Sequence, residues 1–398
     1  MPQFFSFFII LLTAVLFSSL IRRIRVPWVV ALIIGGFIIG PHGLKFFEAN
    51  ATIDFLAAIG LVFLMFMAGL ETKFSDTKGI KKKIGVVALL SGGLPALVGV
   101  AIGLGLGYAW PTAILLGIIF MSSSIALLIP SFQSAGIISS QFGKMIIGAT
   151  ILIDIASLIL LSLFLQSIAG DYNFLIILLY PLLILFLGAL AWILPKIRQA
   201  FGEYAEEEDL FERELRFVLL ILIGLVVLFE FLGLHAIIAG FFAGFILSGS
   251  VQTKIARAKL HAVSYGLFIP LFFVVIGSNI NLSVLQDATL IFPIAIAVVI
   301  GSIGSKFISG WLSGKILGFT AGESAFLGAS TIPSLSTTLA VAFLGFNQGI
   351  LTQELLTSVV LLSIVTSIVS PFLVGLFSKR IESQKTLLRG LAEKEIQN

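Results

Sequence analysis

The sequence predicts an all-α polytopic membrane protein, and three observations favour this fold class: its composition, its long apolar runs and the placement of its charges. Hydrophobic residues make up 59% of the chain and charged residues 11%, and the mean hydropathy is +1.15. Soluble domains carry about 25% charged residues. A chain this poor in charge cannot cover a water-facing surface, so we expect lipid to surround most of it.

About thirteen apolar segments could cross a bilayer, which requires roughly 20 mostly apolar residues. They lie near 4–21, 27–41, 54–71, 84–108, 112–131, 142–167, 173–195, 215–233, 235–249, 261–280, 288–312, 322–346 and 354–378. Of the 24 Lys and Arg residues, 22 fall on one face of this arrangement, Lys45 on the other, and Lys306 inside a span. Because basic loops remain cytoplasmic, we predict a cell-membrane protein with its N-terminus outside and its C-terminus in the cytoplasm.

The residue types exclude several classes of function. The chain has no Cys and only three His, which rules out thiol catalysis and Cys-ligated metal. No carboxylate or His pair has metal-ligand spacing within a span, so we predict no enzyme and no cofactor. The pI of about 9.2 reflects cytoplasmic loops, and no nucleic-acid partner is expected. The charged run at 203–216 is interpreted as a solvated connector.

Two pairs of segments suggest an internal repeat. Residues 31–40 (ALIIGGFIIG) and 235–244 (HAIIAGFFAG) are identical at five of ten positions, and 67–75 aligns with 275–283, so that the two matches have nearly the same offset. Chance similarity between Gly-rich apolar helices is the alternative. Transporters are often built from two inverted halves. We therefore predict a first repeat at 1–172, a linker helix and charged loop at 173–213, an inverted second repeat at 214–378 and a short cytoplasmic tail at 379–398.

Two spans at matching places in these halves look interrupted. One contains MSSSIALLIPS (121–131) and the other GASTIPSLSTTLA (328–340). Pro removes a backbone donor, and freed carbonyls at membrane depth must be buried in protein or line a cavity. Interrupted helices at matching positions indicate a transport site. A Pro-kinked helix used only for packing is the alternative for either span alone.

Two charged residues lie near the middle of predicted spans, Asp154 and Lys306. A centred charge costs about 2.5–3.5 kcal/mol on insertion scales, so its presence suggests a function. A buried carboxyl group can hold a proton or a cation, but not both, and that competition alone yields exchange. A static ion pair between Asp154 and Lys306 is the structural alternative, and the two roles are compatible.

At this point the chain resembles the monovalent cation:proton antiporters, in the branch that holds Kef-type potassium efflux systems and NapA-type sodium/proton antiporters. The resemblance covers essentially the whole chain. The residues that carry it are RVPWVVALIIGGFIIGPHGL (25–44), IGLVFLMFMAGLETKF (59–74), SSSIA (122–126), the Asp154 helix, GLHAIIAGFFAGF (233–245), IPLFFVVIGSNINL (269–282) and GSKFISGWLSGKILG (304–318).

The resemblance implies an NhaA/NapA-like fold, a homodimer, and a mobile core domain that moves like an elevator against the dimer scaffold. It implies that Asp154 binds the ion and the proton and that Lys306 is its basic charge partner. Ser123 and Ser124 would lie at the first helix break, and Thr331 and Ser334 near the second. The transported ions would be H⁺ with Na⁺, Li⁺ or K⁺.

Several alternatives stay open at this stage. Electrogenic relatives carry two adjacent acids on the Asp helix, whereas Ile153 precedes Asp154 here, so we expect one proton per cation unless Lys306 also exchanges a proton. Na⁺/H⁺ exchange is the leading hypothesis and K⁺/H⁺ exchange a close rival. A sodium-coupled organic-anion symporter and a channel are less consistent with a membrane-centred Lys and with the lack of a repeated filter loop.

Overall fold

The structure is a computed structural model in which most of the chain can be described. The described residues are 3–21, 28–46, 50–71, 79–134, 136–138, 140–169, a few positions between 185 and 196, 213–248, 254–280 and 288–396. Every element in these ranges is helical, as the sequence predicts, and the described part of the chain contains no strand. The predicted linker helix and charged loop, 173–213, lie almost entirely outside the described residues.

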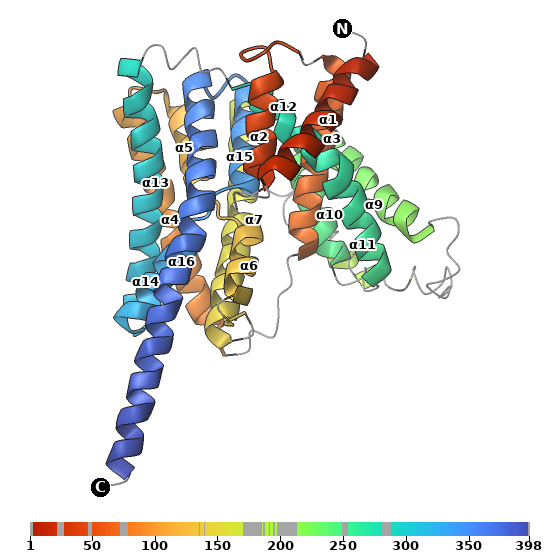
Figure 1. Cartoon of the computed structure of the whole chain (residues 1–398). Helices are drawn as coiled ribbons and strands as arrows, with labels where there is room; N and C mark the ends of the chain where they lie inside the picture. The colour runs from red at the N-terminus through yellow and green to blue at the C-terminus, as the bar shows by residue number, and fades with distance from the viewer. Residues whose placement is uncertain are drawn as a thin grey trace. The chain divides into compact units, whose positions relative to one another are not determined.

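The chain forms two compact units, each assembled from two separate stretches of sequence (Figure 1). Unit 1 comprises residues 1–73 and 158–283, and unit 2 comprises 74–157 and 284–398. The helices of unit 1 are α1 (Gln3–Ile21), α2 (Trp28–Ile39), α3 (Ala51–Glu71), α9 (Arg213–Phe231), α10 (Ala236–Leu247), α11 (Lys254–Val263), the π-helical turn η1 (Ser264–Phe268) and α12 (Ile269–Ser278).

Unit 2 holds the interrupted helices. Its elements are α4 (Lys81–Gly105), α5 (Trp110–Met121), α6 (Ile125–Ser134), the first part of α7 (Gln141–Ala169), α13 (Ala288–Ile316), α14 (Ala321–Thr331), α15 (Ser336–Asn347) and α16 (Gln353–Ile396). The division between the units falls inside α7, after Ser157.

Seven helical segments among the described residues are long and apolar enough to cross a membrane. The segment Ala321–Asn347, which runs through α14 and α15, is the one whose apolar window is wholly buried inside the protein. Shorter apolar helices occur at Phe4–Ser19, Trp28–Ile39, Trp110–Met121 and Ala236–Leu247. The multi-pass character expected from composition is therefore seen, whereas the count of thirteen spans stays a prediction because 173–195 is mostly not described.

Glycines let the helices of unit 1 approach one another closely, and the same contact occurs twice. A methyl group placed on Gly36 of α2 would lie 2.0 Å from the carbonyl oxygen of Val274 in α12. One placed on Gly244 of α10 would lie 2.0 Å from the carbonyl oxygen of Phe66 in α3. The interval along the chain from Gly36 to Gly244 equals the interval from Phe66 to Val274, so the two contacts are related by a single offset.

A second pair of contacts has the same offset. A methyl group on Gly69 would lie 2.0 Å from the carbonyl oxygen of Phe241, and one on Gly277 would lie 2.1 Å from that of Ile33. The packing thus pairs Gly36 with Gly244, whereas the sequence match of 31–40 with 235–244 pairs it with Gly240. That match is one helical turn out of register, because Gly recurs every four residues in these helices and a one-turn slip still aligns glycines.

Unit 2 shows an equivalent recurrence. Gly99 of α4 meets Gly117 of α5 in the way that Gly310 of α13 meets Gly328 of α14, since a methyl group on Gly99 or on Gly310 would lie 2.8 Å from the facing Cα. The interval from Gly99 to Gly310 equals the interval from Gly117 to Gly328. Gly103 with Ala113, and Gly314 with Ser324, repeat the contact one turn further along at the same offset.

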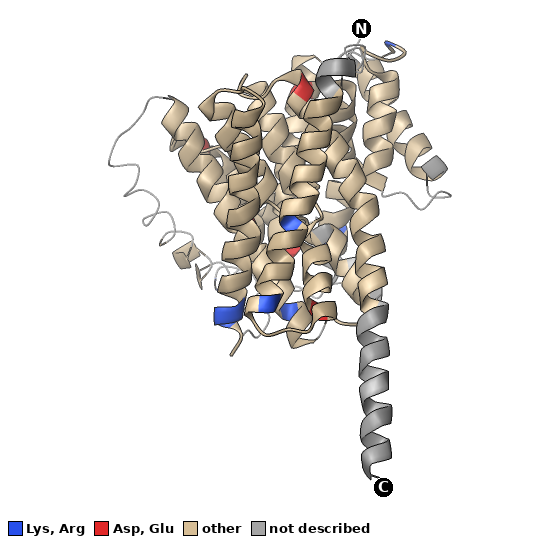
Figure 2. Ribbon diagram, turned by 90° about the vertical axis from the view of Figure 1, so that its left-hand side faces the viewer, with Lys and Arg blue, Asp and Glu red and all other residues tan. Residues whose placement is uncertain are grey.

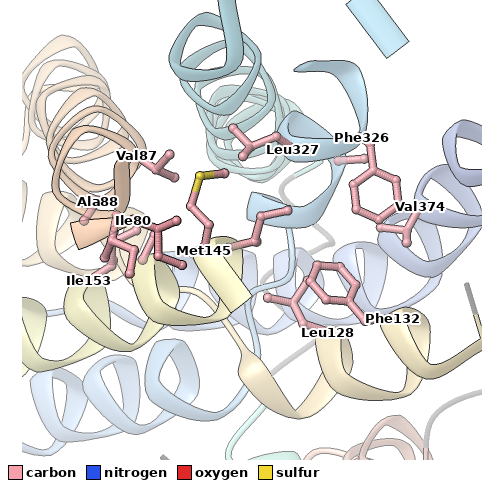
Figure 3. Close-up of a cluster of buried hydrophobic side chains, with 14 of the residues drawn as sticks. Ile80, Val87, Ala88, Leu128, Phe132, Met145, Ile153, Phe326, Leu327 and Val374 are labelled. Carbon is pink, nitrogen blue, oxygen red and sulfur yellow. The ribbon is translucent and has the colours of Figure 1, made fainter. Parts of the chain in front are cut away.

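A cluster of buried apolar side chains fills the part of unit 2 near the starts of α4 and α7 (Figure 3). It draws side chains from α4, α5, α6, α7, α14 and α16. Its larger members include Phe132, Met145, Phe326 and Leu327, all at most 1% exposed. Because a packed interior transmits displacement rather than absorbing it, this cluster fixes α6 and α14, which carry one arm of each interrupted helix.

Basic side chains gather at one end of unit 2, where Figure 2 shows a group of Lys and Arg positions. Lys83 at the start of α4 lies over the ring of Phe319, 5.4 Å from its centroid, and Phe142 at the start of α7 packs on the same ring. The starts of α4 and α7 and the end of α13 therefore share one end. Lys81, Lys82, Lys144 and Lys315 belong to these helix ends.

We predict that Gly36→Ala and Gly244→Ala each destabilise the protein by about 1–3 kcal/mol, because each methyl group meets a backbone carbonyl that cannot move aside. Gly224→Ala in α9 is the matched control, since nothing lies within 4 Å of its added methyl group. Thermal unfolding in detergent measures the difference. Equal unfolding midpoints for all three variants would contradict the close packing.

Candidate functional site

The first break in unit 2 separates α5 from α6. The helix α5 ends at Met121, and Ser122 turns into an extended conformation (φ −67°, ψ 147°) before α6 begins at Ile125. Pro130, one of the residues used to predict the break, lies inside α6. The break is therefore made at the run of serines, whose side chains can satisfy backbone groups locally.

The second break separates α14 from α15 and runs from Ile332 to Leu335. The two breaks are hydrogen-bonded to each other. The Ser124 amide donates to the Pro333 carbonyl oxygen at 2.9 Å, and the Ser123 hydroxyl donates to the same oxygen at 3.3 Å. These bonds satisfy groups that the interruptions free, as backbone at membrane depth requires.

Asp154 of α7 lies beside the first break and is 4% exposed. The amide N–H of Ser123 donates to its Oδ1 at 3.3 Å. Since Ser123 lies just before α6, the carboxylate lies at the helix N-terminus, the end where peptide dipoles favour negative charge. The predicted neighbourhood of Asp154 with Ser123 is thus present in the structure.

Lys306 of α13 is 1% exposed and lies between the breaks. Its ammonium donates to the carbonyl oxygen of Ser122 and to the hydroxyl of Ser334. The Ser122 carbonyl follows the last turn of α5, the end where dipoles favour positive charge. The hydrogen bonds of the Lys306 ammonium that the structure shows go to these two oxygens.

The other predicted site residues divide into two groups. Ser334 lies in the second break against Lys306, as expected. The Thr331 hydroxyl donates to the backbone carbonyl of Lys306 at 2.8 Å and to that of Gly328 at 2.9 Å, which ties α14 to α13. The Thr331 carbonyl oxygen accepts from the Ser123 hydroxyl at 3.4 Å. Ser124 is fully buried, and its hydroxyl has no hydrogen-bond partner among the described residues, which leaves that oxygen available as a ligand.

Three residues of the site were missed by sequence reasoning: Ser122, Thr338 and Thr366. The Ser122 and Thr338 hydroxyls are hydrogen-bonded at 2.8 Å. Thr366 of α16 accepts from the Ser334 amide at 3.3 Å and donates to the Ser334 carbonyl at 3.2 Å. Hydroxyl residues are frequent in this chain, so only an alignment of the two halves could have singled out Thr366.

The arrangement places one carboxylate and one ammonium, both buried, among carbonyl and hydroxyl oxygens. Such oxygens are hard ligands suited to small cations, as in channel filters. No group of three or more His, Cys, Asp or Glu that could hold a metal ion occurs in the described ranges. His235 accepts a hydrogen bond from the Ile237 amide and caps the start of α10.

Comparison with known proteins identifies a family. Residues 8–379 match the family model of the transmembrane sodium/hydrogen exchangers. A probable Na⁺/H⁺ antiporter of Methanocaldococcus jannaschii is 30% identical over 93% of this chain and 95% of its own length. The Na⁺/H⁺-K⁺ antiporter GerN of Bacillus cereus is 28% identical over 92% of this chain and 94% of its own.

The fold is similar to that of the sodium proton antiporter MjNhaP1 from Methanocaldococcus jannaschii. The TM-score is 0.68 at 17% identity, and the match covers 93% of this chain and 96% of the other. The NhaA-like fold that sequence analysis expects is therefore corrected to an NhaP-like one. The two were not distinguished by sequence because broken helices and a buried Asp are not specific to one of them.

We predict that Ser122→Ala destabilises the protein by about 1–3 kcal/mol, because it leaves the buried Thr338 hydroxyl without this partner. The double variant Ser122→Ala/Thr338→Val should recover part of the loss, and a double-mutant cycle measures that coupling. Ser302→Ala is the control, since this buried hydroxyl has no hydrogen-bond partner among the described residues. Additive effects of the two substitutions would contradict the hydroxyl pair.

Proposed function

We propose that this chain, which belongs to the sodium/hydrogen exchanger family, exchanges a monovalent cation for H⁺ across the cell membrane and uses Asp154 as the shared carrier. The observation that carries the proposal is the position of Asp154. Its carboxylate is buried at the N-terminus of α6, bonded to a break residue. The chain is thus a multi-pass transporter and not an enzyme.

The carboxylate makes exchange obligatory. When Asp154 is ionised, its charge and the nearby oxygens of Ser123 and Ser124 can hold a cation. When it is protonated, it is neutral and the cation loses its main electrostatic partner. One carboxylate cannot serve both ions at once, and a bare carboxylate is costly at membrane depth. A site that moves between the two faces only when it is loaded therefore releases one ion for every counter-ion it accepts.

We infer Na⁺, with Li⁺, as the transported cation, because the relatives described above carry sodium in their names. The name of GerN also includes K⁺, and this is the observation that keeps K⁺/H⁺ exchange as the second candidate. The charge at the site supports one proton per cation, since the residue before Asp154 is Ile153 and offers no second carboxylate.

We propose two inverted repeats, 1–172 and 214–378, joined by the linker 173–213, with thirteen spans. The glycine contacts that recur at one constant offset within each unit support this division. Each unit then takes one part of each repeat. Unit 2, which holds the site, is the candidate for the mobile core of an elevator movement, and unit 1 for the scaffold of a homodimer.

The basic end of unit 2 supports an orientation with this end, and the C-terminus, in the cytoplasm. Lys81, Lys82, Lys83, Lys144 and Lys315 are the residues that carry it. Basic residues remain on the cytoplasmic side of a membrane. Because thirteen spans place the two termini on opposite sides, the N-terminus would then lie outside.

We predict that Asp154→Asn abolishes antiport, because the amide can neither release a proton nor neutralise a cation. Fluorescence dequenching in everted vesicles with Na⁺, Li⁺ and K⁺ measures the activity and ranks the ions. Asp54→Asn, an exposed position in the first turn of α3, is the matched control and should leave exchange intact. Exchange by Asp154→Asn that matched the unchanged protein would exclude Asp154 as the carrier.

We predict electroneutral exchange, because one carboxylate trades one charge for one equal charge. Proteoliposomes with equal Na⁺ and equal H⁺ concentrations on both sides should show no net Na⁺ flux when a K⁺ gradient and valinomycin impose a membrane potential. Flux driven by voltage alone would contradict the one-to-one stoichiometry and would point to Lys306 as a second proton-exchanging group.

A further inference from the structure

One hydrogen bond of the site occurs twice in unit 2. The Ser123 amide donates to Asp154 Oδ1 at 3.3 Å, and the Ser334 amide donates to Thr366 Oγ1 at 3.3 Å. The interval from Ser123 to Ser334 is the offset of the glycine contacts in this unit, and the interval from Asp154 to Thr366 is one position longer. Thr366 therefore accepts a hydrogen bond from an amide just before α15, in the same way that Asp154 accepts one from an amide just before α6.

The ligands of the Lys306 ammonium have counterparts in the other half. The ammonium contacts the Ser334 hydroxyl and the Ser122 carbonyl oxygen. At the offset of the glycine contacts, Ser334 corresponds to Ser123 of the first half, and Ser122 corresponds to Pro333 of the second. The counterparts of the two ligands are therefore the Ser123 hydroxyl and the Pro333 carbonyl oxygen. These two groups face each other in the structure, hydrogen-bonded at 3.3 Å.

The two halves differ in what they add to these oxygens. At the same offset, Lys306 corresponds to Pro95 of α4, so the first half has no amine to place between its hydroxyl and its carbonyl. It has the Asp154 carboxylate instead. The second half has the ammonium, and the residue in the position of the carboxylate is the neutral Thr366.

We propose that the two breaks form two equivalent pockets for a monovalent cation, of which one is permanently filled by Lys306. The first pocket, made by the Ser123 hydroxyl, the Pro333 carbonyl and the Asp154 carboxylate, takes the transported ion. The second is made by the Ser334 hydroxyl and the Ser122 carbonyl and holds the ammonium. Thr366 is a positioning residue that fixes Ser334.

The assignment of the first pocket rests on the proposed function, whereas that of the second does not. An ammonium group and a small monovalent cation carry the same charge and are both satisfied by carbonyl and hydroxyl oxygens. An ion that enters the first pocket would separate the Ser123 hydroxyl from the Pro333 carbonyl, as the Lys306 ammonium separates the equivalent groups. Pro333 is then a ligand of the transported ion through its backbone.

The test asks whether an emptied second pocket binds a free ammonium ion. All variants carry Asp154→Asn, which removes the carboxylate of the first pocket. In Asp154→Asn/Lys306→Ala, methylammonium chloride should raise the thermal unfolding midpoint in detergent saturably, by a few degrees, because it binds the folded state alone. Asp154→Asn, with the lysine in place, should not respond.

Two matched controls fix the site of binding. Asp154→Asn/Lys306→Met keeps the side chain up to the atom before the ammonium nitrogen. It leaves the space of a single heavy atom, too small for methylammonium, so this variant should not respond. Tetramethylammonium has the same charge but no N–H donor, and it should have no effect on any variant.

Addition of Thr366→Val to the Lys306→Ala variant should weaken the response at least several-fold, since Ser334 is no longer held.

The outcomes separate this proposal from the proposed function. No methylammonium response with Lys306→Ala, or an equal response with Lys306→Met, would overturn the second pocket, whatever the antiport assay of Asp154→Asn gives. Recovery of the Lys306→Ala variant only in methylammonium buffer would support it. If neither Lys306 variant can be purified, Thr366→Val in the otherwise unchanged chain decides the question.

Thr357→Val is the control for that last comparison. Thr357 lies on the same helix and is 1% exposed, and its hydroxyl has no hydrogen-bond partner among the described residues. We expect Thr366→Val to lower the unfolding midpoint by several degrees and Thr357→Val to leave it unchanged. Equal midpoints for the two would show that Thr366 does not hold the pocket and would reject the proposal.

Discussion

The hydrogen bonds between the two helix breaks are the interaction on which the site depends. Ser124 and Ser123 both donate to the Pro333 carbonyl, so neither interruption is satisfied without the other. This mutual arrangement lets irregular backbone exist at membrane depth. It also brings together two helix N-termini and two C-termini, whose dipoles favour opposite charges. The carboxylate of Asp154 and the ammonium of Lys306 each lie at the end that favours their sign.

The main features of this site could be predicted from the sequence because charge at membrane depth is costly and rare. Asp154 and Lys306 are identified by that cost alone, and the serine run identifies the first break. Thr366 and Thr338 could not be found in this way. A hydroxyl side chain costs little free energy in a membrane helix, and such residues are common in this chain. The role of Thr331 as an ion ligand stays a prediction. Its hydroxyl binds the backbone of α13 and α14, and its carbonyl oxygen accepts from the Ser123 hydroxyl of the first break.

The fold class and multi-pass character also follow from composition, whereas the register of the repeat does not. Apolar helices with Gly every fourth residue look alike after a shift of one turn, and only the contacts of Gly36 with Val274 and of Gly244 with Phe66 fix the offset in unit 1. The NhaA-like expectation failed for a related reason. Broken helices and a central carboxylate define a mechanism more than they define one family fold.

The glycine contacts of unit 1 bear on how tightly the two ion fluxes are linked. Where the Phe241 and Phe66 carbonyls take the space that side chains would fill on Gly69 and Gly244, α3 and α10 leave no room between them for a file of water. A chain of water molecules would conduct protons past the carrier and dissipate the gradient that the exchanger depends on. The small residues at Gly69 and Gly244 therefore keep the seam between α3 and α10 dry, and enlarging either one would open that seam as well as destabilise unit 1.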